Sequence, residues 1–239
     1  MTHQRLLLLS NSKTEGLGYL DHAETVLRDF LGDQVQTVVF VPFAGVRISY
    51  AEYTRLVRDR FGQMGYQIVS LHEAGDPIQA VTEAQAIAVG GGNTFHLLQS
   101  LYAVNVLDAI RQRVAGGLPY IGWSAGSNIA CPTIKTTNDM PIIEPPSFTA
   151  LGVVPFQINP HYIDVHPDGH QGETREERIT EFLVVNPSVT VVGLREGTWL
   201  RREGAQLELG GSKPARIFRH GVSPVEQSPG TDLNFLIDG

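Results

Sequence analysis

The chain has 239 residues and a formal net charge of −7 at pH 7, with 42% hydrophobic and 18% charged residues. These proportions are typical of a soluble folded protein and exclude a disordered chain. No run of lysine and arginine stands out, so the sequence predicts no nucleic-acid partner.

The chain opens with an apolar run at residues 6–9, which is too short for the core of a signal peptide or for a membrane span. Cys131 is the single cysteine, so no disulfide can form within the chain, which favours a reducing compartment. We therefore expect a cytoplasmic protein that does not bind membranes. The sequence leaves the oligomeric state open.

The first half of the chain alternates between predicted strands and predicted helices. Continuous apolar runs, typical of buried parallel strands, occur at residues 5–9, 37–41, 67–71, 86–90 and 119–123. Helix-like segments lie between them, at roughly 19–31, 50–63, 77–84 and 94–115. This alternation predicts an α/β fold with a mostly parallel sheet and helices on both faces. No linker is evident, so we expect a single domain over residues 1–239.

The pattern changes after residue 132. A proline-rich loop leads to a predicted strand within 153–162 and an amphipathic helix at 172–187. The segments TVVGL, TWLRR, AQLEL and ARIFR then read as short strands, expected to pair antiparallel near the C-terminus. The tail from about Gly221 to Gly239 has little periodicity and is expected to be loosely held.

Three predicted strands end in small or reactive residues: Ala44-Gly45, the segment GGGN at 90–93, and Ser124. Open α/β sheets bind their ligands beyond the carboxyl ends of the strands. We therefore expect these three strand ends to meet at one functional edge of the sheet.

Ser124 lies in the segment Gly122–Gly126, which fits the pattern G-x-S-x-G between a predicted strand and a predicted helix. Such a turn exposes the serine hydroxyl as a nucleophile and offers the following N–H, that of Ala125, to an oxyanion. The small residues permit the tight turn. The alternative interpretation is an ordinary glycine-flanked turn.

The GGGN segment is a candidate source of a second oxyanion donor, because glycines let backbone N–H groups approach a ligand closely. A phosphate-binding loop is a weaker alternative, since the segment lacks both G-x-G-x-x-G and G-K-[ST]. Close packing between loops is the third interpretation.

A serine nucleophile needs a base and a group that orients the base. Among eight histidines, His161 is favoured because it ends the predicted strand in QINPHY, next to Pro160. Glu196 follows the apolar segment TVVGL and is the candidate orienting carboxylate. The alternative for Glu196 is a plain turn glutamate.

A metal site is a second interpretation of the histidines. His161, His166 and His170 lie close in sequence to Asp164 and Asp168, but their spacing fits no established ligand motif. We therefore expect no metal, and solvated loop histidines are the simpler interpretation of His166 and His170.

Seven segments, in order along the chain, resemble peptidase E, the aspartyl dipeptidase family. They are LLLLSNS, VFVPFAGV, VGGGNTF, YIGWSAGSNIACPTIKTTNDMPI, QINPHY, GHQGETREERI and VVGLREGTW. The resemblance runs from about Leu6 to Trp199, and weakly to about Phe218. It implies a three-layer α/β sandwich related to class I glutamine amidotransferases, and hydrolysis of dipeptides with an N-terminal aspartate (Asp-X) without a cofactor.

The resemblance also implies roles for particular residues. Ser124, His161 and Glu196 correspond to a Ser-His-Glu catalytic triad, and the N–H groups of Ala125 and Gly92 to the oxyanion hole.

By the same resemblance, Arg175 holds the substrate aspartate, and Asn93 and Asp139 line its pocket. Chemistry agrees, because a substrate carboxylate in an acidic protein needs a fixed cation and arginine offers two parallel donors. The alternative for Arg175 is a surface ion pair along its helix.

Two positions depart from the family pattern: Arg195 stands where proline often precedes the glutamate, and Ser127 where alanine is common. Both departures leave the reacting groups in place. Two other functions stay open, namely a related hydrolase acting on another aspartyl amide or polymer, and a catalytically silent protein that binds a small ligand through GGGN.

Overall fold

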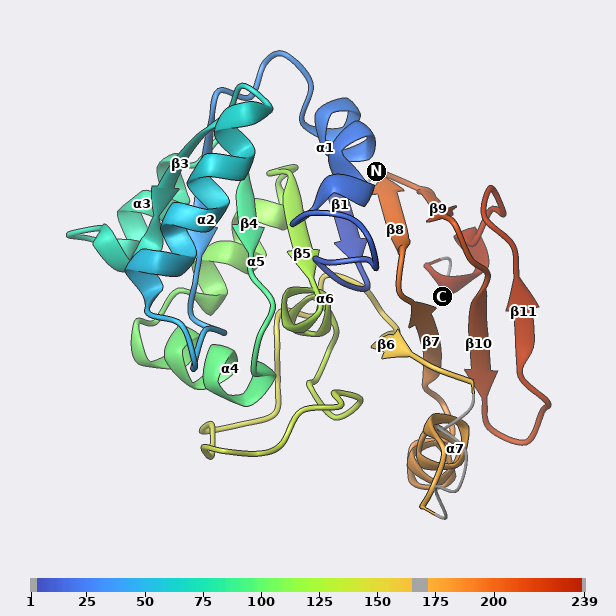
Figure 1. Ribbon diagram of the computed structural model, residues 1–239. Helices are drawn as coiled ribbons and strands as arrows, with labels where there is room; N and C mark the ends of the chain where they lie inside the picture. Colours follow the sequence, from blue (N-terminus) through green and yellow to red (C-terminus); the bar gives the residue numbers. More distant parts are fainter. Residues whose placement is uncertain (1–3, 165–171, 238–239) are drawn as a thin grey trace.

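The computed structural model describes residues 4–164 and 172–237, and their strands form two sheets (Figure 1). The larger sheet has seven strands, in the spatial order β3 (Gln67–Ser70), β2 (Thr37–Val41), β4 (Ile87–Val89), β5 (Tyr120–Trp123), β1 (Arg5–Leu9), β8 (Thr198–Glu203) and β9 (Gln206–Gly211). The first five are parallel, whereas β8 runs antiparallel to β1 and β9 antiparallel to β8. The mostly parallel sheet expected from the alternating pattern is therefore present.

A smaller sheet of four strands lies beside β8 and β9 in Figure 1. Its spatial order is β11 (Val225–Gln227), β10 (Ala215–Arg219), β7 (Thr190–Arg195) and β6 (Gln157–Tyr162). β6 and β7 are parallel, and β10 is antiparallel to both of its neighbours. The four short strands expected near the C-terminus are therefore divided between the two sheets. β7 and β10 lie in the smaller sheet, whereas β8 and β9 lie in the larger one.

Helices cover both faces of the larger sheet. Six helices flank it: α1 (Glu24–Leu31), α2 (Tyr50–Gln63), α3 (Pro77–Glu83), α4 (Thr94–Ala103), α5 (Leu107–Ala115) and α6 (Ala125–Ala130). Successive side chains of a strand point to opposite faces. In β1, Leu7 and Leu9 accordingly join a buried cluster with α1 and α2, while Leu6 and Leu8 join a cluster with α3 to α6. The protein therefore has a mixed α/β fold.

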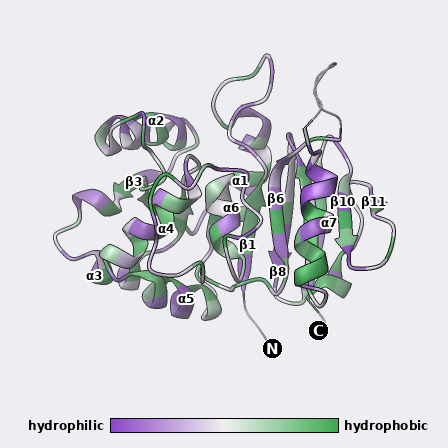
Figure 2. Cartoon of the chain, turned by 90° about the horizontal axis from the view of Figure 1, so that it is seen from below, coloured by the Kyte–Doolittle hydropathy of each residue, from purple (hydrophilic) through white to green (hydrophobic). Residues whose placement is uncertain are grey.

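Helix α7 (Arg175–Val185) packs on the smaller sheet through Ile179 and Leu183, which contact Tyr162 and Phe218. Short 3-10 helices complete the described structure: η1 (Asp21–Ala23), η2 (Leu71–Glu73) and η3 (Asn234–Leu236). In Figure 2, α7 is hydrophilic toward its amino end and hydrophobic toward its carboxyl end, and Ile179 and Leu183 are its buried side chains.

Two expectations from the sequence differ from the structure. The helix expected over 94–115 is divided into α4 and α5, because Asn105 adopts a left-handed conformation (φ 54°) that a continuous helix excludes. The tail from about Gly221 was expected to be loosely held, but its described part, up to residue 237, forms β11 and buries Leu233 and Leu236 (0% and 7% exposed) against the core.

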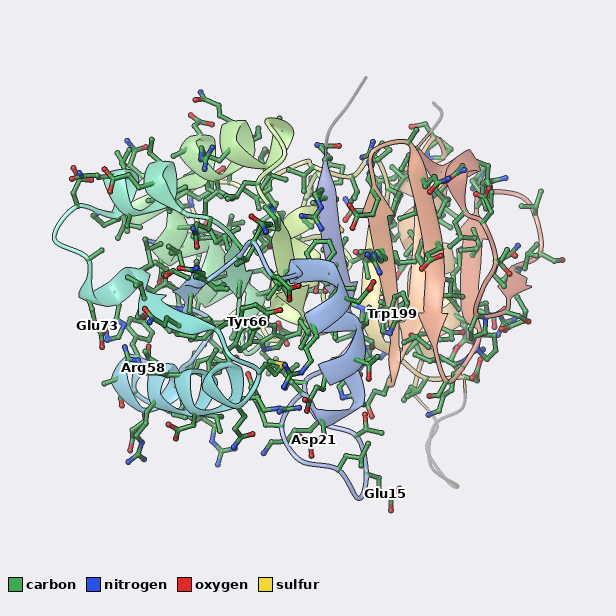
Figure 3. All side chains as sticks on the ribbon, turned by 90° about the horizontal axis from the view of Figure 1, so that it is seen from above. Glu15, Asp21, Arg58, Tyr66, Glu73 and Trp199 are labelled. Carbon is green, nitrogen blue, oxygen red and sulfur yellow. The ribbon has the colours of Figure 1, made fainter. Side chains whose placement is uncertain are left out.

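Surface charges are paired in several places on the outer helices. Figure 3 labels Arg58 of α2 and Glu73 of η2, whose side chains form an ion pair of 3.1 Å. No helix in the described part of the chain is both long and apolar enough to cross a membrane.

Candidate active site

Ser124 stands on a strained turn between β5 and α6, with φ 54° and ψ −112°. Only glycine fits at the two positions that flank this turn, because a side chain there would collide with the backbone. A Cβ added at Gly122 would lie 2.4 Å from the carbonyl oxygen of Gly126, and one added at Gly126 would lie 2.1 Å from that of Val89. The turn keeps Ser124 partly exposed at the carboxyl end of β5, which is the geometry expected from the G-x-S-x-G pattern.

His161 and Glu196 lie in line with Ser124. His161 Nε2 is 3.0 Å from Ser124 Oγ, and His161 Nδ1 is 2.7 Å from Glu196 Oε1. An ionised carboxylate only accepts hydrogen bonds, so Nδ1–H donates to Glu196 and the lone pair of Nε2 faces the serine hydroxyl. The structure therefore brings together the three side chains that the sequence placed at three separate strand ends.

The carboxyl end of β1 holds the three segments that carry these side chains. The Ser124 N–H donates to the Leu9 carbonyl (3.1 Å), and the His161 N–H donates to Ser10 Oγ (2.9 Å). Beyond Glu196, the Gly197 N–H donates to Asn11 Oδ1 (2.8 Å). Three consecutive residues of one strand end thus fix the relative positions of the candidate nucleophile, base and acid.

Ser10 also donates its own hydroxyl hydrogen to the Leu194 carbonyl on β7 (2.7 Å), so it links the base segment to the acid segment. Ser10 and Asn11 are fully buried. No role for Ser10 or Asn11 was predicted from the sequence. The signal was the placement of two polar residues, in LLLLSNS, directly after a buried apolar strand.

The GGGN loop lies against the same turn. A Cβ added at Gly91 would be 3.0 Å from Ser124 Cβ, and one at Gly92 would be 2.1 Å from the Ala44 carbonyl oxygen. Gly92 has φ 139°, which side chains rarely permit. Within residues 4–164 and 172–237, the N–H groups of Gly92 and Ala125 donate no hydrogen bond. Both N–H groups are therefore free to bind an oxyanion.

A cleft of about 780 Å³ opens beside Ser124. Besides His161, its lining includes the charged residues Lys13, Arg47 and Asp139, and its apolar wall includes Tyr19, Ile48, Leu56 and Ile142. Lys13 and Arg47 pair with no acid among the residues that the structure describes. The cleft is large enough for a small peptide and has cations available for carboxylates.

Asn93 and Asp139 line this cleft, but both side chains bind the amino end of α4. Asn93 Oδ1 accepts the His96 N–H (3.0 Å) and its Nδ2 donates to the Met140 carbonyl (2.8 Å). Asp139 Oδ2 accepts from the N–H and the hydroxyl of Thr94 (2.7 and 2.6 Å). The second oxygen of Asp139, Oδ1, has no hydrogen bond to the described residues and stays available.

Arg175 lies apart from the cleft, at the first position of α7. It lines a neighbouring pocket of about 170 Å³, and Asp139 is the residue that lines both spaces. Burial lowers the pKa of the Arg175 guanidinium. The positive charge of Arg178 lowers this pKa further, whereas the negative charge of Asp139 raises it. The buried Nε of Arg175 and the buried Oδ1 of Asn159, another lining residue, have no hydrogen-bond partner among the described residues.

The two departures from the family pattern are explained by packing. Arg195 binds Asp164 and Glu226 through paired hydrogen bonds of 2.5 to 2.8 Å, and its guanidinium lies 5.5 Å from the centre of the Tyr162 ring. Its side chain therefore braces the ends of β6 and β7 and leaves Glu196 free to meet His161. Ser127 donates its hydroxyl to the Leu9 carbonyl at 2.7 Å.

Cys131 is fully buried at the end of α6, and burial raises the pKa of its thiol to about 12. A thiol with such a pKa stays protonated and is a poor nucleophile. Of the alternative metal-site residues, His166, Asp168 and His170 lie outside the described residues. Within the described ranges, no group of three His, Cys, Asp or Glu side chains could hold a metal ion.

The chain is similar to known peptidases over nearly its whole length. The family model described as peptidase family S51 matches residues 6–210. A peptidase E from Nostoc sp. is 49% identical over 235 residues, covering 98% of this chain and 97% of the relative. A peptidase E from Streptomyces coelicolor is 51% identical, covering 98% and 95%. The crystal structure of a peptidase from an acI-B1 Actinobacterium has the same fold, with a TM-score of 0.70, 17% identity and 97% coverage of both chains. The chain belongs to peptidase family S51.

Proposed function

We propose that the protein is a serine-type dipeptidase that hydrolyses Asp-X dipeptides through Ser124, His161 and Glu196 and an acyl-enzyme. The observation that carries the proposal is the hydrogen-bonded series Glu196 Oε1, His161 Nδ1, His161 Nε2 and Ser124 Oγ, with separations of 2.7 and 3.0 Å. A series of this kind activates a hydroxyl that is otherwise a weak nucleophile.

In the first half of the reaction, Ser124 Oγ forms a bond to the scissile carbonyl carbon while its proton passes to His161 Nε2. The carbonyl oxygen becomes an oxyanion that accepts hydrogen bonds from the N–H groups of Gly92 and Ala125. Glu196 stabilises the imidazolium through Nδ1. His161 then gives the proton to the leaving amine, the C–N bond breaks, and an aspartyl ester of Ser124 remains.

In the second half, water attacks the ester carbon as His161 takes one of its protons. The same two N–H groups bind the second oxyanion. His161 returns the proton to Ser124 Oγ as the ester bond breaks, and free aspartate leaves. Each atom and proton of the enzyme is then in its starting position.

For the substrate aspartate, we assign the β-carboxylate to Arg175 and the amino group to Asp139 Oδ1. Support comes from the small pocket, where Arg175 Nε has no partner, and from its junction with the main cleft at Asp139. Burying an arginine donor without a partner is costly, and a bound carboxylate removes that cost. Asn93 serves as part of the wall, because both ends of its amide are already bonded.

A hydrolase of a larger aspartyl amide is the second candidate. It is favoured by the volume of the main cleft, about 780 Å³, which leaves room for a leaving group longer than one residue. We further propose a single domain, a relationship of the fold to class I glutamine amidotransferases, and a cytoplasmic location, on the sequence arguments given above.

The test is a panel of Asp-Leu, Asn-Leu, Glu-Leu and longer Asp peptides with the parent protein and matched variants. Ser124→Ala should lower kcat by on the order of 10⁴-fold or more. Arg175→Ala should lower kcat/KM for Asp-Leu by about 10–100-fold, because the variant loses a charge-assisted hydrogen bond to the substrate. The kcat/KM for Asn-Leu should change little.

Arg58→Ala, which removes a surface arginine paired with Glu73, is the control and should match the parent. Turnover of Asp-Leu by Ser124→Ala at near the parent rate would overturn the proposed nucleophile. Equal turnover of Asp-Leu and Asn-Leu by the parent would overturn the aspartate assignment and leave the serine mechanism standing.

A further inference from the structure

A buried tyrosine of α2, Tyr53, contacts the loop that carries the proposed oxyanion hole. Tyr53 is 6% exposed, and its ring packs edge-on against Phe40 with centroids 5.1 Å apart. Its hydroxyl lies within hydrogen-bond distance of three groups: the Gly91 carbonyl oxygen (3.0 Å), Trp123 Nε1 (3.1 Å) and the Tyr19 hydroxyl (3.3 Å). Tyr53 lines the main cleft, but neither the triad nor the proposed contacts to the substrate aspartate assign it a role.

Counting hydrogens assigns the direction of each of these bonds. The indole N–H of Trp123 can only donate, and the carbonyl oxygen of Gly91 can only accept. The single hydroxyl hydrogen of Tyr53 therefore goes to Gly91, and its oxygen accepts from Trp123 and Tyr19. Burial raises the pKa of Tyr53, which keeps the hydroxyl protonated as this assignment requires.

The Gly91 carbonyl belongs to the same peptide unit as the Gly92 N–H. A peptide unit is planar and trans, so its C=O and N–H point in opposite directions. Fixing the carbonyl toward Tyr53 therefore points the Gly92 N–H away from Tyr53. Glycine accepts both signs of φ, so a Gly-Gly peptide flips more easily than any other unless something holds it.

The absence of a side chain at Gly90 lets Tyr53 reach this peptide. A Cβ at Gly90 would lie 2.6 Å from the Tyr53 hydroxyl oxygen. The same hydroxyl binds Trp123, the residue before Ser124, so it links the GGGN loop to the turn that carries the second N–H, that of Ala125.

We propose that Tyr53 is a positioning residue for the oxyanion hole: its hydroxyl holds the Gly91–Gly92 peptide in the orientation that presents the Gly92 N–H to the oxyanion. The inference rests on the proposed function, because it assumes that Gly92 and Ala125 bind the oxyanion. Without the hydroxyl, the peptide is free to turn its carbonyl oxygen toward the developing negative charge, which opposes the reaction.

Tyr53→Phe tests the inference, since it removes one oxygen and keeps the ring against Phe40. We expect kcat to fall by roughly 10–100-fold, less than the ~100–1000-fold cost of deleting a donor, with KM changed by less than about threefold. Each kcat is divided by the concentration of active sites, titrated with an organophosphorus reagent, so a partly folded preparation still gives a usable value. A peptide aldehyde, whose adduct with Ser124 carries an oxyanion, should bind weaker by about the same factor as kcat falls.

Tyr66→Phe is the matched control. Tyr66, labelled in Figure 3, is a buried tyrosine just before β3. Its hydroxyl lies 3.3 Å from two backbone carbonyls, and it does not line the cleft. Its kcat per active site should match the parent. Replacement of Tyr53 by 3-fluorotyrosine keeps the hydroxyl and should restore kcat.

A kcat for Tyr53→Phe within about twofold of Tyr66→Phe, or a raised KM with unchanged kcat, would overturn the inference. These outcomes are separable from failure of the proposed function. If Ser124→Ala retains activity, the serine mechanism falls. If Ser124→Ala is inactive and Tyr53→Phe is fully active, only the role of Tyr53 falls.

Discussion

Ser10→Ala is the variant that most directly probes how the site is assembled. His161 adopts a left-handed backbone conformation, φ 53°, which costs a residue with a side chain about 1–2 kcal/mol. The hydroxyl of Ser10 offsets this cost by accepting the His161 N–H and donating to the Leu194 carbonyl. Removing the hydroxyl should therefore let His161 relax away from Ser124 and Glu196.

The size of the effect follows from these two bonds. Each contributes about 0.5–1.5 kcal/mol net, so the variant loses about 1–3 kcal/mol of support for the strained conformation. At about 1.4 kcal/mol for each factor of ten, the aligned population and kcat should fall by roughly 5- to 140-fold. Hydrolysis of Asp-Leu, expressed per titrated active site, measures kcat, and urea unfolding measures the loss of stability.

Ser127→Ala is the matched control for Ser10→Ala. It also removes a fully buried serine hydroxyl, but the Leu9 carbonyl that Ser127 binds still accepts the Ser124 N–H at 3.1 Å. We expect a similar loss of stability with kcat close to the parent. Equal kcat values for the two variants would refute the reasoning, because stability alone would then explain any effect of Ser10.

Three further predictions concern packing and charge. Cys131 should resist iodoacetamide in the folded protein and react only after unfolding, as mass spectrometry would detect, because burial raises its thiol pKa to about 12; rapid native labelling would contradict its burial. Gly126→Ala should reduce both stability and activity, since its Cβ would lie 2.1 Å from the Val89 carbonyl oxygen, whereas Gly62→Ala, in open space on α2, should raise stability by about 0.5–1 kcal/mol. Hydrogen bonds from Arg195 lower the pKa of the Asp164 carboxyl, so folded Asp164 binds fewer protons than the unfolded chain. Its stabilising contribution is present above the ordinary carboxyl pKa and is lost as the pH falls through the lowered value, so Asp164→Asn should lower Tm at neutral pH and have little effect in acid; an equal drop in Tm at both pH values would contradict this.

Local sequence patterns predicted the parallel strands and the chemistry at their ends. Buried apolar runs marked β1, β2, β4 and β5, and the strand-end rule selected Ser124, His161 and Glu196. Family motifs added the pairing of Gly92 with Ala125. These features were accessible because each depends on residues that are neighbours in the sequence.

Features that depend on distant contacts were not accessible in the same way. The bonds from Ser10 and Asn11 join residues 151 to 186 positions apart, and no local pattern reports them. The pocket of Arg175 depends on where α7 docks on the smaller sheet. The break at Asn105 has no glycine or proline to mark it; asparagine tolerates the left-handed conformation that it adopts there, but it does not require it.

Asn93 and Asp139 illustrate a third limit. Their residue types suit substrate binding, yet capping the amino end of α4 suits them equally well. Only the hydrogen bonds of the folded chain distinguish the two roles, and they leave one oxygen of Asp139 free while occupying the amide of Asn93.

The most direct measurement of the whole mechanism is the site and rate of covalent labelling by a small organophosphorus reagent. Peptide mass spectrometry should find one adduct, on the hydroxyl of residue 124, and replacement of His161 by glutamine should slow its formation by on the order of 10³-fold or more. Labelling at another residue, or labelling that proceeds at the same rate without the imidazole, would contradict the alignment from which the mechanism is built.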